Sequence, residues 1–156
     1  MFVRNAWYIA AWSDEIAERP LARRILGEPL ALFRDASGSV AALQDRCAHR
    51  AAPLSVGQVV PRGIQCGYHG LVFDTSGKCV LVPGDHKVPP GAQVKAYPVI
   101  EQDALVWVWM GNASEADHRL LTRFPYHNDA RNWPHRHSMM QVSADYQLVI
   151  DNLMDL

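Results

Sequence analysis

The chain has 156 residues, of which 49% are hydrophobic and 20% are charged, and its formal net charge is −1. A chain of this size and composition forms one globular domain, or one domain and part of a second, and is not disordered. It lacks the basic excess typical of nucleic-acid binding, and its longest apolar stretches, such as 104–110, are too short to cross a bilayer. No secretory signal is recognisable at the N-terminus. We therefore expect a cytoplasmic protein that binds neither nucleic acid nor membranes.

Up to about residue 110 the sequence predicts short strands separated by turns, with no long helical period. In the run 105–110 both faces are apolar, which places that strand in the interior of the domain. Turn signals with glycine, or with acidic and amide side chains, separate the strand-like runs. We expect three hairpins, over 29–45, 70–84 and 92–111, with their turns at 35–38, 75–78 and 101–103.

After Gly111 the character of the sequence changes. The stretch 112–124 predicts a short helix with Ser114 as its N-cap, and 124–137 reads as a loop. The stretch 138–142 is strand-like, and 144–156 has apolar residues at helical spacing. The chain stops inside that last pattern without a C-cap, so we expect it to be a fragment of a longer protein.

Three cysteines and several histidines carry the chemistry that the sequence suggests. An odd number of cysteines with no sign of export argues against a disulfide framework. Cys79 lies in a strand-like run and is expected to be a small buried hydrophobe. The other two form Cys47-Ala48-His49 and, after sixteen residues, Cys66-Gly67-Tyr68-His69. Both motifs lie in loops between predicted strands, which suits a functional site on a rigid scaffold.

Two metal centres could use this set of four ligands. Zinc bound by two cysteines and two histidines is the simplest alternative, but its usual pattern groups the cysteines together and then the histidines. Here each motif offers one cysteine and one histidine. That alternation suits a two-iron cluster in which one iron takes both thiolates and the other iron both imidazoles.

The two motifs, Cys47-Ala48-His49-Arg50 and Cys66-Gly67-Tyr68-His69-Gly70, resemble the ligand loops of a Rieske domain. The resemblance implies an antiparallel β-sheet domain over residues 1–112, with two cluster-binding loops. It also implies a [2Fe–2S] cluster with Cys47 and Cys66 on one iron and His49 and His69 on the other.

The ligand set bears on the reduction potential. Two ferric ions, two sulfides and two thiolates sum to zero charge, because neutral imidazoles add none, so histidine ligation raises the potential above that of an all-cysteine cluster. The high-potential Rieske proteins that resemble this one add a disulfide beside the cluster and a serine after the second histidine. Here neither loop has a second cysteine, and Leu71 stands where that serine would be. We expect a potential in the lower part of the Rieske range, because fewer hydrogen bonds reach the sulfides.

The end of the chain, "DNLMDL" at 151–156, resembles the start of the mononuclear iron motif of Rieske non-haem iron oxygenases. In that family the residue matching Asp155 bridges the Rieske histidine of one subunit, here His69, to an iron-ligating histidine of its neighbour. Asn152 matches a residue often found near that iron. Residues 113–156 are thus expected to be a linker and the incomplete beginning of an α+β catalytic domain. The iron-ligating histidines would follow Leu156, so mononuclear Fe(II) is expected in the full-length protein only. None of the other histidines occupies a ligand position of that motif. The other histidines are His86, His118, His127, His135 and His137.

Within that family the sequence is similar to the oxygenase subunits of vanillate O-demethylase and of the dicamba and toluenesulfonate monooxygenases. The similarity implies a homotrimer that receives electrons from an NAD(P)H-dependent reductase or a ferredoxin. Its substrates would be O₂ and a methoxy- or methyl-substituted aromatic acid, which it would O-demethylate or hydroxylate. The alternative is a stand-alone electron carrier of the Rieske ferredoxin type, which needs only the first 110 residues or so.

Overall fold

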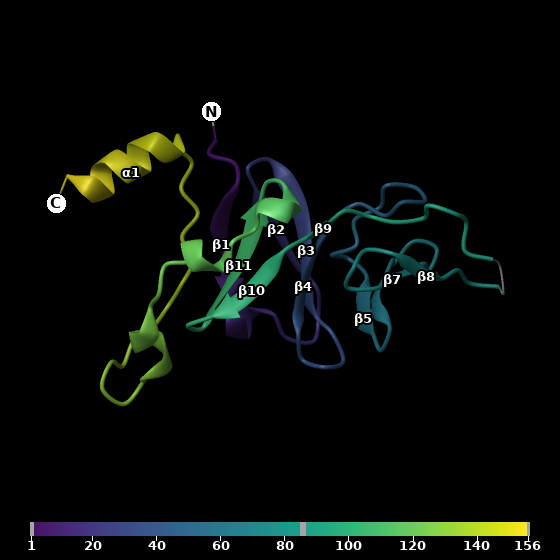
Figure 1. The fold of residues 1–156 in the computed structure, drawn as a ribbon, viewed down its shortest axis with the longest axis horizontal. Coiled ribbons are helices and arrows are strands. Elements are labelled where there is room, and N and C mark those ends of the chain that lie inside the picture. The colour runs from purple at the N-terminus through teal and green to yellow at the C-terminus, as the bar shows by residue number, and fades with distance from the viewer. Residues whose placement is uncertain (1, 85–86, 156) are drawn as a thin grey trace.

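The computed structural model describes residues 2–84 and 87–155, which form three antiparallel sheets and one α-helix (Figure 1). The first sheet has the order β1 (Ala6–Trp12), β11 (Leu105–Met110), β10 (Val99–Gln102). The second has the order β2 (Leu21–Ile25), β3 (Glu28–Arg34), β4 (Val40–Gln44), β9 (Ala96–Tyr97). The third has the order β5 (Gln58–Val60), β6 (Gly63–Gln65), β7 (Val72–Phe73), β8 (Cys79–Leu81). The predicted mainly β, antiparallel class is confirmed.

The second sheet separates two hydrophobic cores, and β3 contributes to both. Leu30 and Leu32 face the core shared with the first sheet, whereas Ala31 and Phe33 face the core shared with the third sheet. Alternate side chains of a strand point to opposite faces, so a strand between two cores is apolar throughout. β11 is likewise buried at all six positions, as predicted from its two apolar faces.

Two of the three predicted hairpins have the same turn chemistry. The Asp35 and Asp74 carboxylates each accept hydrogen bonds from backbone amides two and four residues ahead, and Gly38 and Gly77 adopt positive φ angles of 86° and 83°. The third turn lies later than predicted. Glu101 and Gln102 belong to β10, and the left-handed residues are Asp103 and Ala104.

The segment after β11 is less regular than predicted. Instead of one helix over 112–124 there are two single turns of 3-10 helix, η2 (Ala113–Glu115) and η3 (His118–Leu120). Asn112 and Asp117 cap them, so Ser114 is not the N-cap. Leu120 is 64% exposed and only Leu121 is buried, so no apolar stripe supports a longer helix.

The remaining C-terminal elements follow in the order loop, then helix. The predicted strand over 138–142 is wrong, because these residues have no regular structure. The loop contains one further 3-10 turn, η4 (Pro125–Asn128). A last 3-10 turn, η1 (Ser13–Glu15), lies near the N-terminus, directly after β1. The predicted terminal helix is confirmed as α1 (Tyr146–Met154), with the Asp145 side chain capping its first turn. Within the described part of the chain, no helix is long and apolar enough to span a membrane.

Candidate metal centre

Each of the two cysteine–histidine loops is closed by the same pattern of backbone hydrogen bonds. In the first loop, the amide of Cys47 donates to the carbonyl of Ala52 at 2.8 Å, and the amide of Ala51 donates back to the Cys47 carbonyl at 2.9 Å. In the second, the amides of Cys66 and Gly70 make the corresponding bonds at 2.8 and 3.0 Å, the first of them to the carbonyl of residue 71. Each cysteine is therefore held at the neck of a closed loop, so its side chain has a fixed direction.

Each loop turns through a left-handed residue at the same distance from its cysteine. Four residues after Cys47 this is Ala51, with φ = 55°, and four residues after Cys66 it is Gly70, with φ = 74°. The sequence did not reveal this correspondence, because one motif reads Cys-x-His and the other Cys-x-x-His. The correspondence becomes visible when positions are counted forward from each cysteine instead of from each histidine.

The two motif thiols are buried next to each other. Cys47 is 4% exposed and Cys66 2% exposed, and both belong to the core between the second and third sheets. Burial raises the pKa of the Cys47 thiol; hydrogen bonds from the backbone amides of His49 and Arg50 lower it, while its contact with the Cys66 thiol raises it. The amides favour the thiolate, which is the form that binds metal. Cys79, the third cysteine, is buried as predicted.

The two motif imidazoles lie at the surface, one on each loop. Their ring centroids are 4.6 Å apart, with an angle of 62° between the planes. His49 and His69 are both exposed, and the ring of Tyr68, itself 66% exposed, packs against His69 at 3.8 Å. The loops thus present a pair of imidazoles outward and a pair of thiols inward.

This pairing fits a two-iron cluster better than a single zinc ion. A structural zinc site brings four protein ligands to one ion, whereas each iron of the cluster takes two protein ligands and completes its coordination with the bridging sulfides. The thiol pair and the imidazole pair match the two ends of the cluster.

Supporting contacts hold the first loop against the third sheet. The Asp45 carboxylate accepts hydrogen bonds from the amide and the hydroxyl of Ser55, at 2.7 and 2.6 Å, and so fastens the two ends of the loop. A Cβ on Gly57 would lie 2.0 Å from the carbonyl oxygen of Gln65, so only glycine allows this approach to β6. These residues carry no metal-ligand signature, so sequence reasoning missed them.

Asp155 and Asn152 lie far from the cluster loops of their own chain. Both are exposed, Asn152 on α1 and Asp155 as its C-cap residue. α1 and the third sheet, which flanks the second loop, occupy opposite ends of the long axis (Figure 1). A contact between Asp155 and His69 therefore requires a second chain.

Of the remaining histidines, three surround one tryptophan instead of joining the centre. The ring centroids of His127, His135 and His137 lie 5.2, 6.3 and 4.2 Å from that of Trp12. His135 and His137 lie in an irregular loop, as predicted. The other two are His118, which is exposed on a 3-10 turn, and His86, which lies outside the described residues.

A β-domain that offers two buried thiols and two exposed imidazoles on paired loops has the architecture of a mixed-ligand iron–sulfur domain. The chain belongs to the Rieske [2Fe-2S] domain family, whose pattern matches residues 6–105. The group bound by domains of this family is a [2Fe–2S] cluster, and the donor set described above fits it.

Known relatives extend the match beyond the Rieske domain. The iron-sulfur subunit of the toluene-4-sulfonate monooxygenase system of Comamonas testosteroni is 44% identical, over 99% of this chain and 45% of that protein. The oxygenase component of dicamba O-demethylase from Stenotrophomonas maltophilia is 46% identical, over 99% of this chain and 46% of that protein. A crystal structure of dicamba monooxygenase with non-heme iron and dicamba superposes with a TM-score of 0.89 at 46% identity. The match covers 99% of this chain and 47% of that chain.

The chain spans about half the length of the curated relatives it matches. The matches nevertheless include nearly all of it, so they cover the linker and α1 as well as the Rieske domain. This coverage favours a portion of an oxygenase subunit over a stand-alone Rieske ferredoxin, which has no need of residues beyond about 110.

Proposed function

We propose that this chain is the electron-transfer portion of an oxygenase subunit, with Cys47 and Cys66 as ligands of one iron and His49 and His69 as ligands of the other. The observation that carries the assignment is the shared backbone frame of the two loops, which places the thiols together in the core and the imidazoles together at the surface. The cluster supplies one-electron transfer when bound. Exposed imidazoles shorten the path from a partner molecule to the iron.

The chain's own residues favour this role in two ways. The backbone amides of His49 and Arg50 lower the pKa of the Cys47 thiol and so oppose the larger effect of burial, which raises it. Both thiols are buried in the hydrophobic core between the second and third sheets, whereas both imidazoles are exposed. Reduction therefore proceeds most directly through the histidine end.

We assign residues 1–112 to the Rieske domain and 113–156 to a linker and the beginning of a catalytic domain. The last strand ends at Met110, and the segment beyond it has no strand among its described residues. In an assembled oxygenase, Asp155 would accept a hydrogen bond from His69 of a neighbouring subunit. The distance between α1 and the cluster loops of one chain supports this arrangement (Figure 1). Asn152, on the same helix, would lie near the mononuclear Fe(II).

For the whole protein we propose a cytoplasmic homotrimer that is supplied by an NAD(P)H-dependent reductase or a ferredoxin. Its proposed reaction is O-demethylation or methyl hydroxylation of a substituted aromatic acid with O₂. The names of the relatives support this: they are dicamba and vanillate O-demethylase components and a toluene-4-sulfonate monooxygenase subunit.

Single cysteine substitutions test the ligand assignment. Cys47→Ser and Cys66→Ser should each abolish the visible absorption and the EPR signal of the reduced protein, because a serine hydroxyl does not replace a thiolate at iron. Cys79→Ser is the matched control, since Cys79 is equally buried but lies on β8. It should retain the cluster. A full cluster signal in the Cys47 or Cys66 variant would overturn the assignment.

A further inference from the structure

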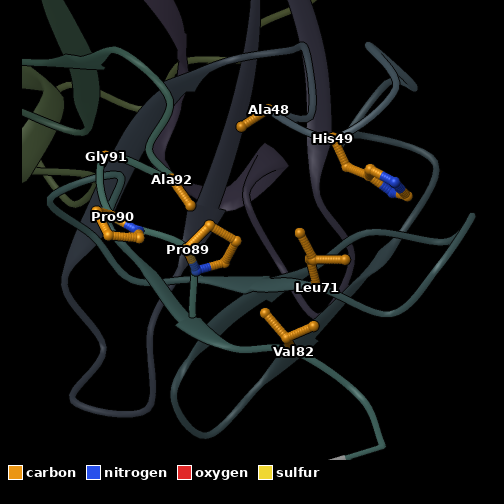
Figure 2. Close-up of a pocket in the computed structure, with 8 residues that line it drawn as sticks. All are labelled: Ala48, His49, Leu71, Val82, Pro89, Pro90, Gly91 and Ala92. Carbon is orange, nitrogen blue, oxygen red and sulfur yellow. The ribbon is translucent and has the colours of Figure 1, made fainter. Parts of the chain in front are cut away.

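Histidines line pockets in two parts of the molecule. One pocket, of about 440 Å³, lies beside His49 and has apolar walls that include Leu71 and Val82 (Figure 2). Its imidazole belongs to the cluster loops described above. A second pocket, of about 200 Å³, lies on the linker and is lined by two imidazoles, those of His127 and His135. The cluster loops use neither of them, so this second pair has no assigned role.

One nitrogen of each linker imidazole is bound to a backbone carbonyl group. The Nδ1 of His127 lies 3.1 Å from the carbonyl oxygen of Asp103, and the Nδ1 of His135 lies 3.1 Å from that of Trp133. A carbonyl oxygen can only accept a hydrogen bond, so Nδ1 is the donor in both rings and the neutral imidazole keeps its lone pair on Nε2. Neither Nε2 has a hydrogen-bond partner among the described residues. Metal-ligating histidines are usually held in this way, with the second ring nitrogen donating to a carbonyl or carboxylate.

The two rings are separated by a distance that one ion can bridge. Their centroids are 5.0 Å apart, with an angle of 37° between the planes. Two imidazoles on one tetrahedral ion have centroids roughly 5 Å apart, because each nitrogen lies about 2.0–2.1 Å from the ion. Aromatic neighbours fix the two rings further: Phe124 stacks on His127 at 5.5 Å, and the Trp12 centroid lies 5.2 Å from His127 and 6.3 Å from His135. The pair is therefore held in place before any ligand binds.

We propose that His127 and His135 bind one divalent transition-metal ion through their Nε2 atoms. Imidazole nitrogen suits Zn²⁺, Cu²⁺ and Ni²⁺, whereas Mg²⁺ and Ca²⁺ prefer oxygen ligands. Water would complete the coordination of the ion, because the site lies in an open pocket at the surface. The proposal goes beyond the proposed function and does not depend on it.

A metal ion at this site would close the part of the linker between its two ligands. His127 is attached to the turn between β10 and β11 through the carbonyl of Asp103, whereas His135 lies in an exposed stretch without regular structure. The ion would therefore hold the mobile ligand against the fixed one. Between them, the amide of Trp133 donates to the carbonyl of Asp129 at 2.8 Å. An ion that binds only the closed arrangement stabilises this hydrogen bond by mass action.

Calorimetric titration of the oxidised, cluster-loaded protein with Zn²⁺ tests the ligand pair. His127→Gln and His135→Gln should each bind Zn²⁺ at least about tenfold more weakly than the unmodified protein, because one of two protein ligands is lost. The matched control is His137→Gln. Its ring also stacks on Trp12, at 4.2 Å, but its Nε2 lies 3.2 Å from the Asp14 carboxylate, so its loss should change the affinity less than about threefold. Equal losses in the three variants, or competition by Mg²⁺, would overturn the proposal.

Two measurements on the unmodified protein keep the test independent of how the variants fold. EPR of Cu²⁺ added to the oxidised protein, in which the cluster is EPR-silent, should show coupling to two histidine nitrogens, and the visible spectrum confirms that the cluster stays intact. Zn²⁺ should slow hydrogen exchange at the Trp133 amide severalfold and leave exchange at the Leu120 amide, on η3, unchanged. A copper spectrum with no histidine coupling would overturn the proposal. So would exchange at Trp133 that is the same with and without Zn²⁺.

Discussion

At Ala51 the chain tolerates a backbone conformation that usually requires glycine. The left-handed region costs a residue with a Cβ roughly 1–2 kcal/mol. The equivalent position in the second loop is Gly70, which avoids that cost. The hydrogen bond from the Ala51 amide to the Cys47 carbonyl closes the first loop in this conformation. The strain at Ala51 is therefore a consequence of holding the cysteine and histidine of that loop in place.

The two equivalent positions should respond oppositely to exchange of glycine and alanine. Gly70→Ala introduces a left-handed alanine whose Cβ would lie 2.9 Å from the Pro83 Cγ, so it should lower the free energy of unfolding by about 1–2 kcal/mol. Ala51→Gly relieves strain but makes the unfolded chain more flexible, so it should raise that free energy by less than about 1 kcal/mol. Denaturant unfolding of the cluster-loaded protein measures both. Changes of the same sign and size would show that the two loops are not equivalent.

The four candidate ligands could be predicted because their pattern is local. A cysteine and a histidine two or three residues apart must share one loop, whatever the rest of the fold does. The pairing of thiol with thiol and imidazole with imidazole was less accessible, because it depends on how two loops face each other across a core. The expected low reduction potential stays a prediction. Leu71, at the position of the serine of the high-potential proteins, is buried and has no hydroxyl to donate to a sulfide.

Among the elements, the β10–β11 turn fastens the linker to the sheet. The Asp103 side chain, 2% exposed, accepts hydrogen bonds from the Arg123 Nε at 3.1 Å, the Phe124 amide at 2.7 Å and the Asn128 side-chain amide at 2.9 Å. The ion pair with Arg123 lowers the pKa of this carboxyl group. Its contribution to stability is therefore present above the ordinary pKa of an aspartate and is lost as the pH falls.

Removing the Asp103 charge should release the linker without disturbing the cluster. Asp103→Asn keeps a residue that tolerates the left-handed conformation but turns an amide toward groups that all donate hydrogen bonds. Loss of these bonds should cost about 1.5–3 kcal/mol locally, so the Phe124 amide should exchange with solvent more than tenfold faster.

The control is Asp117→Asn, because Asp117 caps its own 3-10 turn and pairs with Arg119 two residues away. It should leave exchange at Phe124 unchanged. Equal acceleration in both variants, or a loss of the cluster spectrum in Asp103→Asn, would contradict the role of Asp103 as a linker contact.

Elements were predictable where one side chain determines the local backbone. Asp35 and Asp74 each organise a turn that ends in a glycine, so both hairpins could be recognised from the sequence. The third turn was displaced because Asp103 serves the linker as well as the turn, and its partners are 20 to 25 residues away. The expected helix after Gly111 failed because Asn112 and Asp117 begin separate short turns.

At the scale of the whole molecule, α1 and the cluster loops lie at opposite ends (Figure 1). α1 has no buried residue, and large apolar side chains on it are exposed, among them Leu148 and Leu153. The curated relatives of this chain are about twice as long as the chain itself. We therefore expect that in the longer protein α1 packs against the catalytic domain and presents Asp155 to a neighbouring subunit.

Asp155→Asn in a longer protein that includes the catalytic domain should slow reoxidation of the cluster by the neighbouring subunit at least tenfold. A neutral amide is a weaker acceptor than a carboxylate for a hydrogen bond from His69. Both metal centres should remain present, as measured by metal content and EPR. Asp151→Asn is the matched control on the same helix, and it should reoxidise at a rate closer to that of the unmodified protein. Unchanged reoxidation in Asp155→Asn would remove that residue from the bridge.

The central claim is that one two-iron cluster is held by two cysteines and two histidines of these loops. Its most direct test is electron–nuclear double resonance on the reduced protein with ¹⁵N-labelled histidine. We predict signals from two strongly coupled histidine nitrogens, and the loss of one of them in His49→Ala or His69→Ala if the cluster survives the substitution. A spectrum without histidine coupling, or a colourless protein that contains one zinc ion, would contradict the account.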